Sequence, residues 1–283
     1  MPWSPLLMNY PAMQVLLSWI ISIACVAEGM PSPTEQAQAL ALKKNRQEAS
    51  VVLLKAIGSA APKSRAKLVE VLHTLTKVFF TDKGQRLFEA GQAGMFDSPD
   101  VALGQLREAL KIEDENILIL DNIARVQLQK LDCSGALSTL KAARALNPYL
   151  PDPAVLELRA LICLKNFETF RESLKALPTL EKTQDSYVQY LVAQDLLQQQ
   201  MWRRATEVLT KVSEDQPRFP ETYYFLSKAS AGLEINGEAY AQKYVTLCKG
   251  LGPRERNQFS NEPRLCLNAK ETEDELAKKN SEP

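Results

Sequence analysis

The chain has 283 residues, of which 45% are hydrophobic and 24% are charged, an ordinary composition for a protein with a packed core. Lys and Arg number 34, as do Asp and Glu, so the formal net charge is +0. This balance provides no overall attraction to nucleic acid, and we expect no nucleic-acid partner. Gly is scarce, with 11 residues, while helix-favouring residues dominate, which predicts an all-α protein.

The N-terminus carries an apolar stretch that begins at Met13 and stays uncharged up to Ala27. It is shorter than the roughly 20 residues of a membrane-spanning helix but fits the apolar part of a secretory signal peptide. We therefore expect residues 1–27 to be an export signal, although no Lys or Arg precedes the stretch. The expected location is the periplasm or cell envelope. The alternatives are an uncleaved N-terminal membrane anchor and a buried helix, and Cys25 is a possible lipidation site.

Cysteine usage is compatible with export. Besides Cys25 the chain contains Cys133, Cys163, Cys248 and Cys266, an even number that permits disulfides in three possible pairings. One possible pair is Cys248 with Cys266, because residues 253–263 form a plausible loop between them. Buried free thiols are the alternative. The irregular spacing, without a Cys-x-x-Cys motif, does not suggest a zinc site, and no metal is expected.

Helical periodicity and an internal repeat organise the rest of the chain. Residues 28–80 are predicted to form a helical hairpin, with helices over 34–57 and 63–80. Corresponding positions then recur at intervals of 34, 34, 35 and 34 residues, at Ala102, Ala136, Phe170, Ala205 and Ala239. Such a period indicates stacked helix-turn-helix units, because one hairpin cannot bury its own apolar stripe. We expect five units over residues 81–248 and a largely flexible extension over 249–283.

The second unit shows the pattern most clearly. It places small residues at Ala136 and Ala143, a large one at Leu140, and a helix-stopping Pro148. This pattern resembles the tetratricopeptide repeat (TPR) family, although the third unit departs from it with Phe170 at a small position. The resemblance implies a right-handed α-solenoid whose first helices line a concave groove that binds proteins or peptides.

The sequence offers little for catalysis. Its single histidine, His73, is interpreted as an ordinary helix residue, and no nucleophile, phosphate-loop or metalloprotease motif is present. We therefore expect a non-enzymatic protein without a cofactor.

Positions beside the packing residues of the first helices are predicted to face the groove and to bind the partner. They are Asp121, Arg125, Leu128, Tyr187, Tyr190, Gln194, Tyr224 and Lys228. The alternative is that the tyrosines belong to the core and that Asp121 and Arg125 form a surface pair one helical turn apart. Two functions remain open: an envelope adaptor that binds a peptide or protein segment, and a structural assembly factor, such as a pilotin-like lipoprotein, of an envelope machine.

Overall fold

The computed structural model describes residues 31–177, 185–252, 256, 258–259, 261–262 and 264–281. The predicted export signal and Cys25 lie outside these residues. Within them all regular secondary structure is α-helical, which confirms the predicted fold class. No helix in the described part of the chain is long and apolar enough to cross a membrane.

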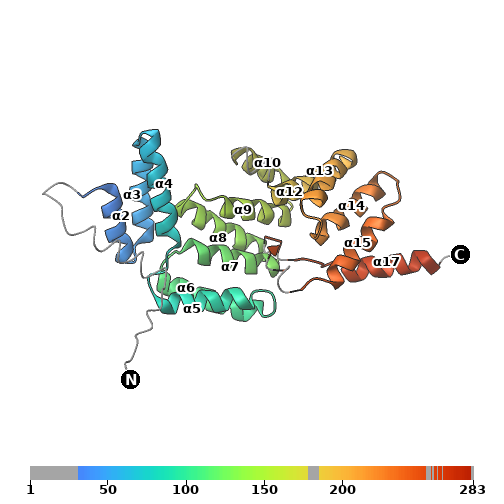
Figure 1. Cartoon of the computed structure of the whole chain (residues 1–283), viewed down its shortest axis with the longest axis horizontal. Helices are drawn as coiled ribbons and strands as arrows, with labels where there is room; N and C mark the ends of the chain where they lie inside the picture. Colours follow the sequence, from blue (N-terminus) through green and yellow to red (C-terminus); the bar gives the residue numbers. More distant parts are fainter. Residues whose placement is uncertain are drawn as a thin grey trace, which may run out of the picture.

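The helices pack mainly against their neighbours in the chain, as sequential pairs. The N-terminal helices are α2 (Pro33–Leu42), α3 (Arg46–Ser59) and α4 (Pro62–Lys77). Five hairpins follow: α5 (Asp82–Gly94) with α6 (Pro99–Glu113), α7 (Ile117–Gln129) with α8 (Cys133–Leu146), α9 (Pro151–Cys163) with α10 (Phe167–Ala176), α12 (Ser186–Gln198) with α13 (Trp202–Asp215), and α14 (Pro220–Gly232) with α15 (Glu238–Lys249). The last described helix is α17 (Ala269–Ser281). Figure 1 shows the hairpins stacked into an elongated solenoid that starts at α2.

The repeated small residues sit where helices approach one another. Ala102, Ala136 and Ala205 are 0% exposed, and so is the larger Phe170 in the third hairpin. Contacts of α6 with α7, α8 with α9, α9 with α12 and α13 with α14 then join successive hairpins into one stack. Because each hairpin buries its apolar side against the next one, the repeat specifies the packing of the solenoid.

The predicted first helix of the N-terminal hairpin is divided in two, so that prediction was wrong in detail. The chain turns between α2 and α3, where Lys44 has a φ of 59°. The side chain of Asn45 then accepts a hydrogen bond from the Glu48 N–H and caps the start of α3. A lysine in the left-handed region followed by a capping asparagine ends one helix and starts another.

A buried polar cluster docks these N-terminal helices onto the first hairpin. Arg46 on α3 and Glu113 on α6 are both fully buried, with 3.3 Å between Nη2 and Oε2. Arg46 also donates to the carbonyl oxygen of Val78 at 2.5 Å, and Glu113 accepts the N–H groups of Phe80 and Thr81 at 2.8 and 2.9 Å. The N-terminal helices therefore continue the stack.

The C-terminal extension is more ordered than expected. Helix α17 packs against α15, with Thr272 and Leu276 buried on its inner side (Figure 1). Lys249 on α15 reaches Glu273 on α17, with Nζ and Oε1 2.5 Å apart. The sequence of this helix is strongly polar, and a few buried residues on one side are enough to hold it against the stack.

Two disulfides tie the described chain together. Cys248 at the end of α15 is bonded to Cys266, with 5.5 Å between their Cα atoms. Cys133 is bonded to Cys163 at a Cα separation of 6.1 Å, which joins the second hairpin to the third. The Cys248–Cys266 pair is the one considered from the sequence. The Cys133–Cys163 pair belongs to one of the pairings that the sequence left open.

Candidate functional site

The first helices α7, α9, α12 and α14 present polar side chains to a common surface, which we call the inner face. It is formed by Asp121 and Arg125 on α7, Arg159 on α9, Tyr187 and Tyr190 on α12, and Glu221 on α14. Part of this surface is covered by the chain itself. The contacts come from Phe259, Asn261, Glu262 and Cys266. We call the described residues around them, 256, 258–259, 261–262 and 264–268, the C-terminal segment.

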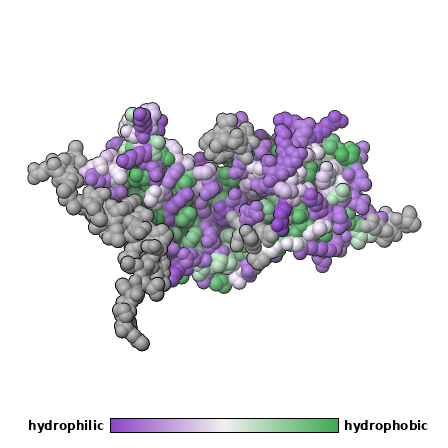
Figure 2. Space-filling view, viewed as in Figure 1, coloured by the Kyte–Doolittle hydropathy of each residue, from purple (hydrophilic) through white to green (hydrophobic). Residues whose placement is uncertain are grey.

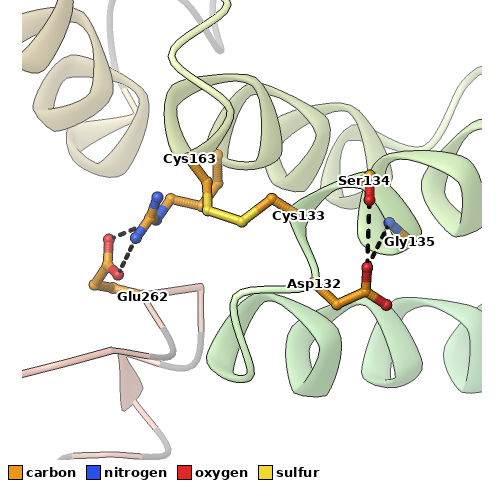
Figure 3. Close-up of a disulfide and its surroundings, with 7 residues drawn as sticks. Asp132, Cys133, Ser134, Gly135, Cys163 and Glu262 are labelled. Carbon is orange, nitrogen blue, oxygen red and sulfur yellow. Dashed lines mark hydrogen bonds and ion pairs between the residues drawn. A yellow bond between two sulfur atoms is a disulfide. The ribbon is translucent and has the colours of Figure 1, made fainter.

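The strongest contact between segment and inner face is a buried ion pair. Both carboxylate oxygens of Glu262 accept hydrogen bonds from Arg159, at 2.8 Å from Nη2 and 2.9 Å from Nε. Glu262 is 2% exposed, and the hydroxyl groups of Tyr187 and Tyr190 each lie 3.4 Å from its Oε2. Figure 3 shows Glu262 reaching from the C-terminal segment toward the helices that the Cys133–Cys163 disulfide joins. This bidentate geometry fixes the orientation of the segment as well as its position.

Further contacts hold the segment on either side of this pair. The ring of Phe259 is 7% exposed and lies 5.0 Å from the ring of Phe219, which precedes α14. The Tyr187 hydroxyl donates to the carbonyl oxygen of Asn261 at 2.6 Å. At the Cys248–Cys266 disulfide, the Cys266 N–H donates to Glu221 Oε1 at 2.5 Å. The segment is thus recognised through main-chain atoms, an aromatic ring and a carboxylate.

Burial changes the protonation of the groups beneath the segment. It raises the pKa of Glu221 to about 8, an effect that the Cys266 N–H offsets in part and that the charge of Glu262 reinforces. Burial, reinforced by Glu262, also raises the pKa of the Tyr187 and Tyr190 hydroxyls well above their ordinary value. These hydroxyls consequently act as neutral hydrogen-bond donors.

The structure distributes the predicted groove residues over several environments. Arg125 and Tyr187 come together at Asn261, where Arg125 donates to the side-chain oxygen and Tyr187 to the carbonyl. Tyr187 and Tyr190 are 8% and 2% exposed, so both rings are covered. Leu128 is 2% exposed within an apolar cluster and does not face the surface.

Two further predicted positions, Tyr224 and Lys228, lie on the next first helix, α14, and Gln194 lies on α12. Tyr224 on α14 is half-buried, and the Nζ of Lys228 lies 5.3 Å from its ring centroid. The ring of Tyr224 is also 5.2 Å from that of Tyr244 on α15. Gln194 on α12 is half-buried, and its Nε2 has no hydrogen-bond partner among the described residues.

The inner face continues beyond the segment into an open cavity of about 560 Å³ between α5, α7 and the start of α9. Its lining consists of Phe88, Glu89, Gln92, Ala93, Met95, Leu118, Asp121, Asn122, Arg125 and Asp152. Asp121 is 6% exposed, and its Oδ1 is buried without a hydrogen-bond partner in the described part of the chain. Burial raises the pKa of Asp121 to about 7; Arg125 offsets part of this effect, and Asp152 adds to it.

Two residues of the inner face, Arg159 and Glu221, were not predicted, and neither was Glu262 of the C-terminal segment. Arg159 had a sequence signal, because Arg159 and Glu157 are the only charged residues in the otherwise apolar stretch Val155–Cys163. Its partner Glu262 lies 103 residues away in a polar region, where nothing in the sequence distinguishes it from other carboxylates. The described residues contain no group of three His, Cys, Asp or Glu side chains placed to hold a metal ion.

Comparisons with known proteins give structural matches only. No protein-family model and no curated protein matches the chain. Two solved structures of MamA are similar to it. The MamA RS-1 ArsTM double mutant has 16% identity, covering 60% of this chain and 97% of that one with a TM-score of 0.46. MamA 41-end from Desulfovibrio magneticus RS-1 has 15% identity, covering 60% and 95% with a TM-score of 0.45.

A tetratricopeptide repeat protein from Parabacteroides merdae is 16% identical, with coverage of 87% of this chain and 90% of that one and a TM-score of 0.44. The fold assignment depends on the chain's own geometry. Its described helices pair in sequence order, and three of the small residues of the repeat, Ala102, Ala136 and Ala205, lie buried, whereas Ala239 is exposed. The described part of the chain is an all-helical solenoid of sequentially paired helices.

Proposed function

We propose that this protein is a non-enzymatic interaction scaffold that binds a peptide or protein segment along its inner face. One observation carries the proposal: the inner face already holds a turn-rich segment of the chain itself, the C-terminal segment. The Arg159–Glu262 pair, the Phe219–Phe259 ring contact and the Tyr187 hydrogen bond to a backbone carbonyl are contacts that a solenoid uses to bind a peptide.

The open cavity is where a partner would bind. Arg125 lines the cavity and also donates to Asn261, so the covered and open parts of the inner face meet at this residue. The cavity is lined by apolar side chains, those of Phe88, Met95 and Leu118, together with polar ones such as Asp121 and Asn122. A partner segment could therefore lie in the cavity without displacing the C-terminal segment.

We also propose that the protein is exported to the cell envelope. The apolar N-terminal stretch supports this, as do the two disulfides, because stable disulfides form in oxidising compartments.

Site-specific photo-crosslinking in the cells that produce the protein tests the binding proposal. A photoreactive amino acid replaces Gln92, an exposed residue that lines the cavity. The matched control places it at Lys141, which is exposed on α8 away from the cavity. We expect a discrete crosslinked product from position 92 and none from position 141. No product at position 92, or the same product from both positions, would contradict the proposed function.

A further inference from the structure

We propose that the cavity between α5, α7 and α9 binds a basic side chain, lysine or arginine, of the partner segment, with Asp121 as its counter-ion. This inference deepens the proposed function and rests on it. It assigns a chemical class to the ligand of a site that no motif in the sequence identifies.

The first argument is the state of the Asp121 carboxyl group. It is 6% exposed and lines the cavity, yet its Oδ1 has no hydrogen-bond partner in the described part of the chain. A buried polar atom without a partner is costly, so proteins normally satisfy such atoms. An ammonium or guanidinium group entering the cavity would supply the missing donor and a positive charge in addition to that of Arg125.

The second argument is the charge of the surrounding walls. Three carboxyl groups line the cavity, those of Glu89 on α5, Asp121 on α7 and Asp152 near the start of α9. One guanidinium, that of Arg125, also lines it, but it donates to Asn261 of the C-terminal segment. The excess of carboxylates favours a cation over an anion or a neutral polar group.

The third argument is the shape and chemistry of the remaining lining. Phe88, Met95 and Leu118 provide apolar surface, while Gln92 and Asn122 provide further hydrogen-bonding groups. A lysine or arginine stem can pack its methylene groups along apolar walls while its charged end reaches a carboxylate. A metal ion fits less well, because no metal-binding group of three ligands occurs among the described side chains.

Methyl NMR of the full-length chain tests the assignment. Met95 is 2% exposed and lines the cavity, so its ¹³C-labelled methyl group reports on occupancy. Met201 lies beside Trp202 in a separate pocket and serves as an internal control. The probes are three tripeptides blocked at both ends, each Gly-X-Gly with X as lysine, arginine or norleucine.

We expect the lysine or the arginine peptide to shift the Met95 signal and to bind about tenfold more tightly than the norleucine peptide. This factor is at the lower end of what a hydrogen bond to a charged group contributes. Asp121→Asn should abolish the preference, while Asp274→Asn, which removes an exposed carboxylate on α17, should preserve it. An unchanged Met201 signal shows that Asp121→Asn leaves the fold intact.

The binding should also strengthen as the pH rises from about 6 to about 8. The pKa of Asp121 is about 7, so its carboxyl group loses its proton in this range and gains the charge that a cation needs. The other groups that act on Asp121 are Arg125, Asp152 and Lys77 on α4. Asp121→Asn should remove this pH dependence.

Equal affinity for the basic and norleucine peptides would overturn the assignment, as would a preference that survives Asp121→Asn. Tighter binding of free putrescine than of either basic peptide would assign the cavity to a small amine instead. Failure here is distinguishable from failure of the proposed function. Crosslinks at position 92 without a basic-peptide preference would leave the scaffold role standing and refute only the cation site.

Discussion

Replacing Glu262 with Gln should loosen the C-terminal segment from the inner face. In the native chain, Glu262 accepts hydrogen bonds from Arg159 at 2.8 and 2.9 Å, and the two side chains are only 3% and 13% exposed. The amide retains the size of the carboxylate but removes its charge. Arg159 would then keep a buried charge with no ionised partner at this position.

The expected loss in the free energy of unfolding is about 3 kcal/mol. Breaking one side of a buried ion pair typically costs about 3–5 kcal/mol. We expect the lower end because Glu221 lies close by. Its pKa is raised in part by the charge of Glu262, so removing that charge lets Glu221 ionise more readily and partly compensate Arg159.

Urea unfolding followed by the helical circular dichroism signal measures this loss, with the slope of the transition as a check that two-state behaviour is retained. The matched control is Glu273→Gln, which removes an ion pair whose side chains are 63% and 50% exposed and should cost less than about 1 kcal/mol. Combining Glu262→Gln with Arg159→Met should recover part of the loss. If Glu262→Gln costs no more than Glu273→Gln, the pair does not hold the segment as described.

Three further predictions concern the stack, the disulfide and pH. Ala136→Asp should abolish cooperative unfolding by placing a charge at a position that is 0% exposed, whereas Ala145→Asp, on the exposed side of the same helix, should retain the native melting profile in circular dichroism. Cys266→Ser should lower the free energy of unfolding by roughly 3 kcal/mol through the loop entropy of the 18-residue separation, and an unchanged urea midpoint would count against it. Stability should fall as the pH rises from about 5 to about 8, because folding raises the pKa of Glu221 from 4.5 to about 8 and the folded chain holds a proton that the unfolded chain releases. Glu221→Gln should reduce this slope, and an identical slope in both proteins would exclude Glu221 as its source.

The solenoid could be predicted from the sequence because its determinants are local and repeated. Ala136 and Leu140 recur with a fixed period, and this period reflects contacts between neighbouring helices. The break between α2 and α3 was missed because helical periodicity continues across Lys44, and the left-handed conformation there has no glycine to signal it.

The inner face was predictable only in part. Tyr187 and Arg125 lie on first helices and contact Asn261, but the segment that makes these contacts is remote in sequence. Glu262 lies 103 residues from Arg159, and a polar stretch without periodicity gives no indication that it returns to the stack. Leu128 was predicted to face the groove but is buried in an apolar cluster. Helical spacing defines which side of a helix a residue lies on, but it does not show how much of that side the next hairpin covers.

Amide hydrogen exchange resolved by NMR provides the most direct test of the central claim, that the inner face holds the C-terminal segment of the chain. The N–H of Cys266 donates to Glu221, and the N–H of Asn268 donates to the hydroxyl of Tyr244 at 3.2 Å. In the oxidised full-length protein both amides should exchange far more slowly than those of an unfolded chain, and Glu262→Gln should accelerate the exchange at Cys266. Exchange of the Cys266 amide at the rate of an unfolded peptide would contradict the account, because the segment would then not be held on the inner face.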